Sequence, residues 1–285
     1  MKAKAEDCPP QNRKALRKTG GLFGVESGEP SPRNTELSPE RKEWIMALFA
    51  ISDLHLALSV DKPMDVFGPR WAGYMDKLKE NWCSVVGEDD YVVVPGDISW
   101  ATYLDQAYED FRFIHELPGK KIISKGNHDY WWTTRSKLEK FVGGNGFTSI
   151  SFMHNNSFSV EGATICGTRG WEMPGEVGFG AEDAKIYQRE LQRLEMSLQA
   201  GLAEISSDPA LAGNVVIAAL HYPPFNSRGE FSGFMDIMKK YGVKICIYGH
   251  LHGDACRGAV EGLVDGIMFR LVAADHLGFM PEKLY

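Results

Sequence analysis

Five short apolar runs, each followed within three residues by a polar residue of metal-binding type, constrain this chain more than any other feature of its sequence. The runs are ALFAIS (47–52), YVVVP (91–95), KIIS (121–124), NVVIAAL (214–220) and VKICIY (243–248). Each has the length and apolar content of a buried strand. Amphipathic stretches that predict helices lie between them, at about 70–86, 102–117, 133–142 and 181–205. This alternation is typical of an α/β protein.

Two further stretches, 149–168 and 266–274, also have the composition of strands. Their polar and apolar residues alternate in places, which favours antiparallel pairing. We therefore expect them to supply a second sheet.

The polar residues that follow the five buried runs are of a few types only. They are Asp53-Leu54-His55, Gly96-Asp97, Gly126-Asn127-His128-Asp129, His221 and Gly249-His250-Leu251-His252. In open α/β sheets, ligands bind beyond the carboxyl ends of the strands. We therefore expect all five segments to meet in one place.

Carboxylate oxygens, an amide oxygen and imidazole nitrogens suit hard to borderline divalent metal ions. A carboxylate such as Asp97 can bridge two such ions, which would otherwise repel one another. A pair of ions lowers the pKa of a bound water toward neutrality, so that the water becomes the nucleophile. Glycines at Gly96, Gly126 and Gly249 allow the backbone to turn tightly and approach the ions.

The ordered series D-x-H, G-D, G-N-H-D, H and G-H-x-H, which spans residues 53 to 252, resembles the calcineurin-like metallophosphoesterases. In its motifs the chain looks closest to the small predicted phosphohydrolases of bacterial type. The resemblance implies a four-layer α/β/β/α sandwich, with two mixed sheets flanked by helices. It also implies a hydrolase of phosphomonoesters or phosphodiesters with two divalent metal ions, Mn, Fe or Zn, as cofactors.

The resemblance assigns roles to the matching positions. One metal ion would be held by Asp53, His55 and His252, the other by Asn127, His221 and His250, with Asp97 bridging them. His128 would lie near the leaving-group oxygen as general acid or transition-state stabiliser. Asp129 would orient its imidazole, and a carboxylate beside a histidine also raises the pKa of that histidine.

Two departures from the pattern argue against a protein Ser/Thr phosphatase. Such enzymes carry an arginine in a longer second motif, where this chain reads Gly96-Asp97-Ile98-Ser99-Trp100, and a glutamate where it has Asp129. A phosphodiesterase acting on a cyclic nucleotide or a nucleic-acid end stays an alternative. A non-catalytic scaffold of the same fold is a second alternative, against which the complete set of ligand positions and His128 argues.

Three weaker signals lie outside the motifs. Arg169 can grip a substrate phosphate with two hydrogen bonds, or can form an ordinary surface ion pair. The aromatic run 130–132 can stack on a base or sugar, although packing is the plainer interpretation. The loop 170–185 can act as a lid or be a simple surface loop.

Composition restricts the partners and the compartment. A net charge of −7 argues against binding to nucleic acid and leaves a small phosphorylated substrate as the expected partner. The sequence has no apolar stretch long enough to span a membrane, no signal-peptide core and no CxxC pair, so we expect a cytoplasmic protein. Residues 1–45, rich in Pro, Gly and charged residues, predict a disordered extension before a single catalytic domain at 46–285. The sequence leaves the oligomeric state open.

Overall fold

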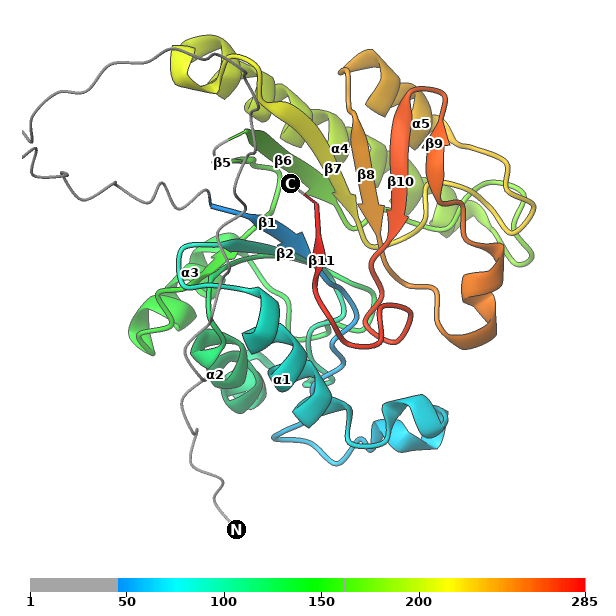
Figure 1. Ribbon diagram of the computed structural model, residues 1–285. Helices are drawn as coiled ribbons and strands as arrows, with labels where there is room; N and C mark the ends of the chain where they lie inside the picture. Colours follow the sequence, from blue (N-terminus) through cyan, green and yellow to red (C-terminus); the bar gives the residue numbers. More distant parts are fainter. Residues whose placement is uncertain (1–45, 161, 285) are drawn as a thin grey trace, which may run out of the picture.

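The computed structural model describes residues 46–160 and 162–284 (Figure 1). The extension predicted to be disordered, 1–45, lies outside the described residues. Within the described part of the chain, no helix has the length and apolarity needed to cross a membrane.

Two mixed sheets form the centre of the fold. The first has the strand order β11 (Glu282–Lys283), β1 (Leu48–Ala50), β2 (Tyr91–Pro95), β3 (Lys120–Ser124) and β4 (Ile150–Phe152). Strands β1 to β4 run parallel and β11 is antiparallel to β1. The second has the order β5 (Phe158–Val160), β6 (Ala163–Thr168), β7 (Val215–Leu220), β8 (Ile245–Tyr248), β10 (Ile267–Leu271) and β9 (Gly262–Val264).

Helices cover the outer face of each sheet (Figure 1). Those on the first sheet are α1 (Tyr74–Val85), α2 (Tyr108–Glu116) and α3 (Arg135–Gly144), and those on the second are α4 (Ala181–Ser207) and α5 (Gly233–Lys240). Short 3-10 helices occupy several loops: η1 (Met64–Phe67), η2 (Pro69–Trp71), η3 (Leu104–Ala107), η4 (Pro209–Leu211) and η5 (Gly253–Gly258).

Three apolar layers separate these elements. One packs α1 to α3 on the first sheet, and another packs α4 and α5 on the second. The third lies between the sheets, so that Val93 of β2 faces inward while Val92 and Val94 face the helices. Because these strands are buried on both faces, they read as continuous apolar runs. The expected four-layer sandwich is confirmed.

The composition of the second sheet differs from the prediction. Stretch 149–168 divides between the sheets, since β4 pairs in parallel with β3. In the second sheet β6, β7, β8 and β10 are parallel, and only the edge strands β5 and β9 are antiparallel. The long helix α4 makes the crossover that parallel pairing of β6 with β7 requires. A hairpin through Asp265 and Gly266, both with positive φ, turns β9 back onto β10.

Candidate metal centre

The polar segments that follow β1, β2, β3, β7 and β8 meet at the carboxyl edge of the two sheets. Backbone hydrogen bonds join them, because Asp53 N donates to Gly96 O at 3.0 Å and His55 N donates to Asp97 O at 3.0 Å. Gly249 N donates to His221 O at 3.1 Å on the opposite sheet. The convergence expected from strand ends is therefore present in the structure.

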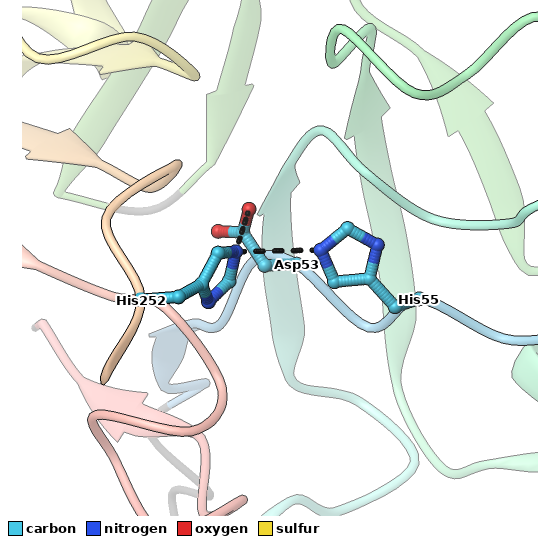
Figure 2. A group of neighbouring side chains, drawn as sticks. All are labelled: Asp53, His55 and His252. Carbon is cyan, nitrogen blue, oxygen red and sulfur yellow. Dashed lines mark hydrogen bonds and ion pairs between the residues drawn. The ribbon is translucent and has the colours of Figure 1, made fainter. Parts of the chain in front are cut away.

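A first group consists of Asp53, His55 and His252, whose donor atoms all lie within 4.8 Å of one another. His252 Nε2 lies 3.3 Å from Asp53 Oδ1 and 3.3 Å from His55 Nε2. Figure 2 shows the two imidazoles directed toward each other, with the Asp53 carboxylate beside them. Asp53 and His55 are buried.

A second group consists of Asp53, Asp97 and His221. His221 Nε2 lies 3.5 Å from Asp97 Oδ2, and His221 Nδ1 lies 3.9 Å from Asp53 Oδ1. The same Asp97 oxygen lies 3.8 Å from His55 Nε2. The Asp97 carboxylate thus faces side chains of both groups.

Asn127 and His250 adjoin the second group. Asn127 Oδ1 lies 2.6 Å from His221 Nε2 and 3.0 Å from His250 Nδ1. All seven side chains singled out as ligands from the sequence are therefore neighbours in one cluster.

The donor set fits a divalent cation. Asp53 and Asp97 are both buried, and their ion-pair partners among the described residues are histidines, without a lysine or arginine. Buried carboxylates need a compensating positive charge. Burial, followed by the charge of Asp53, raises the pKa of Asp97 to about 8 when only protein groups surround it. A bound cation would reverse this shift by favouring the ionised carboxylate.

The histidines of the cluster differ in their proton affinity. Burial lowers the pKa of His55 and of His250 to about 3, so both are neutral, which is the form that binds a metal ion. Burial also lowers the pKa of His252, but its hydrogen bonds to Asp275 and Asp53 outweigh this and raise it to about 10.

Unusual backbone conformations hold the ligands in place. Asp53, His55, Asp97 and His250 have φ values of 59°, 46°, 53° and 71°, in the left-handed region that residues other than glycine rarely adopt. Such strain gathers at functional sites, where the surrounding structure enforces it. At Gly126, an added Cβ would collide with the Asp97 carboxylate. Only glycine fits at that position.

Asp275 is a site residue that the sequence analysis missed. Its carboxylate accepts hydrogen bonds from His252 Nδ1 at 2.8 Å and from Gly253 N at 3.0 Å. This leaves His252 Nε2 to face Asp53, as is usual for a metal-binding histidine with a carboxylate partner. The signal was available, because Asp275 closes the apolar run 266–274 as the other ligands close theirs.

Asp129 does not orient the imidazole of His128, contrary to the expectation. Its two oxygens accept hydrogen bonds from the indole of Trp131 and from four backbone N–H groups, those of Asp97, Ile98, Ser99 and Gly126. Asp129 therefore ties the loop after β2 to the loop after β3. These donors occupy both oxygens, and among the described residues no hydrogen bond joins the Asp129 carboxylate to the His128 imidazole.

His128 is half-buried at the edge of the cluster. Its backbone N–H donates to Asp97 Oδ1 at 2.8 Å, and its ring packs on Trp100 with 4.4 Å between centroids. Nδ1 is buried without a hydrogen-bond partner among the described residues. Burial, followed by the charge of His221, lowers the pKa of His128, where a carboxylate partner had been expected to raise it.

The weaker candidates lie around the cluster. Arg169 forms an ion pair with Glu190 at 3.5 Å and stacks on Trp171. Of the aromatic run, Trp131 is buried in the core and Tyr130 is exposed. Part of the loop 170–185 lines a cavity of about 490 Å³ that also reaches His250.

Comparison with known proteins places the chain in a family. No curated protein matches. Among solved structures, a phosphopantetheinyl hydrolase from Mycobacterium tuberculosis is similar, with 16% identity, a TM-score of 0.48, and coverage of 84% of this chain and 95% of that one. A protein of unknown function from Aquifex aeolicus has 17% identity, a TM-score of 0.44, and the same coverage of each chain.

The family model for calcineurin-like phosphoesterases matches residues 46–254. This range contains all seven candidate ligands, together with His128 and Asp129. Membership implies metal-dependent hydrolysis of a phosphoester. The chain belongs to the calcineurin-like phosphoesterase family.

Proposed function

We propose that this protein hydrolyses a phosphomonoester or phosphodiester of a small molecule, using two divalent metal ions bound by the seven clustered side chains. The position of Asp97 carries the proposal, since its Oδ2 lies 3.8 Å from His55 Nε2 and 3.5 Å from His221 Nε2. A single carboxylate placed between two sets of ligands suits a pair of ions better than one.

The ligands divide between the two sites. Asp53, His55 and His252 would hold one ion, and Asn127, His221 and His250 the other, while Asp97 would contribute to holding both. When bound, such a pair lowers the pKa of a water molecule and neutralises charge on the phosphoryl oxygens. The donor set accepts Mn, Fe or Zn.

Residues of the chain itself supply the remaining steps. His128 would donate a proton to the leaving-group oxygen, held there by its N–H bond to Asp97 and by packing on Trp100. Asp275 keeps the Nδ1 proton of His252 in place. Asp129 fixes the relative position of the two loops that carry Asp97 and His128. Arg169 would contact the substrate from the side.

Two alternatives concern the substrate and the chemistry. A phosphodiesterase for cyclic nucleotides or nucleic-acid ends uses the same metal chemistry, but the net charge of −7 disfavours nucleic acid. A scaffold without activity has no need of strained ligand positions such as those of Asp53 and Asp97. We expect a cytoplasmic enzyme that acts on a small phosphorylated molecule.

The test is hydrolysis of p-nitrophenyl phosphate and bis-p-nitrophenyl phosphate by metal-stripped protein, with Mn²⁺, Fe²⁺ or Zn²⁺ restored in turn. Turnover that returns with metal, at two ions per chain, supports the proposal, and the preferred ester separates monoesterase from diesterase. Two bound ions without turnover of either ester would favour the scaffold. Full turnover with one ion would refute the dinuclear centre.

A further inference from the structure

A cavity of about 350 Å³ lies beside the metal centre. It is lined by Lys125 after β3, His154 after β4, Arg169 after β6, and Glu190 and Arg193 on α4. Lys125, His154 and Arg169 each come after the end of a strand, as the metal-centre residues do. The cavity therefore opens along the same edge of the two sheets as the metal centre.

The cavity occupies the next position along that edge. The metal-centre ligands follow β1, β2, β3, β7 and β8, whereas the cavity lies among the ends of β3, β4 and β6. Lys125 is two residues from Asn127, and Arg169 O accepts hydrogen bonds from the backbone N–H groups of His221 and Tyr222 at 3.0 and 2.9 Å. Adjacent residues of the same backbone segments therefore line the two sites.

Positive charge exceeds negative charge in this cavity. Lys125, Arg169 and Arg193 line it, against the single carboxylate of Glu190, which leaves an excess of two. Glu190 is fully buried, and it accepts from Arg193 Nη1 at 2.9 Å and from Thr168 Oγ1 at 2.6 Å. One carboxylate is thus shared among the surrounding cations.

Three nitrogen atoms around the cavity have no hydrogen-bond partner among the described residues. The buried Nε of Arg169 and the buried Nδ1 of His154 have no hydrogen-bond partner. The half-buried ammonium of Lys125 makes no hydrogen bond or ion pair within the part of the chain that the structure describes. Leaving buried donors unpaired is costly, and grouped ammonium and guanidinium donors match a phosphate.

We propose that this cavity binds a second phosphate group of the substrate while the metal centre takes the phosphate that is cleaved. Lys125 at the cavity is two residues from Asn127 at the metal centre, and two residues span at most about 7 Å, so the two sites are close together. The substrate class is therefore a small bisphosphorylated molecule whose two phosphates are joined through a short carbon chain. The inference rests on the proposed function, because it deepens the specificity of the same site.

The first experiment measures phosphate binding without catalysis. Metal-stripped protein is titrated with inorganic phosphate by calorimetry, in the native form and as Lys125→Met, Arg193→Gln and Arg189→Gln. Arg189 is the matched control, because it lies on the same helix 3.7 Å from Glu190 but does not line the cavity. We expect one site, weakened about 10-fold or more in the first two variants and unchanged in the control.

The second experiment compares substrates with metal restored, using p-nitrophenyl phosphate and an alkanediol bisphosphate with a four-carbon chain. Lys125→Met removes no hydrogen bond or ion pair among the described residues, so it should raise KM for the bisphosphate about 10-fold and leave kcat/KM for p-nitrophenyl phosphate within about 2-fold. Equal losses for both substrates, or none for either, would overturn the inference. Wild-type protein that hydrolyses p-nitrophenyl phosphate but does not prefer the bisphosphate would overturn this inference alone. Absence of metal-dependent turnover would instead contradict the proposed function.

Discussion

The metal centre and the cationic cavity lie side by side at one edge of the molecule, yet they gather opposite chemistry. Around Asp53 and Asp97 the chain places carboxylates and imidazoles, among them the neutral rings of His55 and His250, and this donor set attracts cations. Around Arg169 it places ammonium and guanidinium groups, which call for an anion. The carboxyl ends of neighbouring strands can therefore form one composite site with two electrostatic halves.

The largest loss of activity should come from substituting the residue of the metal centre that faces both ligand groups. Asp97→Asn removes the negative charge that faces both ligand groups, so both ions should be lost and turnover should fall to background. Elemental analysis and initial rates measure this. Exposed Asp105→Asn is the control for the same chemical change. Two retained ions with full activity would contradict the bridging role.

His128→Ala tests a residue that lies at the metal centre but is not one of the proposed metal ligands. Turnover should fall by about 10²–10⁴ with the metal content intact, as for a lost general acid. The loss should be larger for an alkyl phosphate than for p-nitrophenyl phosphate, whose leaving group needs no proton. Loss of metal would show that His128 is a ligand.

The stability that the fold gains on binding a metal ion or phosphate distinguishes the metal centre from the cationic cavity. A metal ion or phosphate present at 100 times its dissociation constant stabilises the folded state by about 2.7 kcal/mol. Metal should raise Tm by binding at the metal centre, and phosphate should raise the Tm of metal-stripped protein by binding in the cationic cavity. Differential scanning calorimetry of Lys125→Met should show the full metal shift but a phosphate shift reduced to about half, because a 10-fold weaker site leaves about 1.4 kcal/mol at the same phosphate concentration. An undiminished phosphate shift in this variant would place phosphate elsewhere.

Asp275→Asn should have the smallest effect, because Asp275 acts through His252. Loss of such a partner weakens metal affinity by about 10- to 100-fold, and at saturating metal most of the activity should return. Competition with a chelator measures the affinity. Activity that stays low at saturating metal would mean that Asp275 does more than orient the imidazole.

The sequence predicted that the seven candidate ligands would gather in one place, because the information for this is local. Asp53 and His221 each follow an apolar run directly, Asp97 follows one after Gly96, and strand ends in an α/β sheet converge as a rule. The helix predicted at 181–205 matches α4, because an apolar stripe of that length has few alternatives.

The features of the fold and of the site that the sequence did not predict depend on contacts between distant segments. The pairing of Arg169 with Glu190 and the cavity they line depend on how α4 packs on β6, which no short motif encodes. The role predicted for Asp129 was wrong because it was inferred from adjacency to His128 in the sequence. In the structure its carboxylate accepts hydrogen bonds from backbone N–H groups instead. The sheet to which β4 belongs likewise follows from pairing with β3, not from its own residues.

The division of the ligands between the two sheets has a consequence for the lifetime of the protein. Asp53 and Asp97 extend from the first sheet, and His221 and His250 from the second, so an ion bound by them would fasten one sheet to the other. It would act as a removable crosslink that must open before the sheets separate. Metal supply would then govern the rate of unfolding, and with it the rate at which proteases clear the chain.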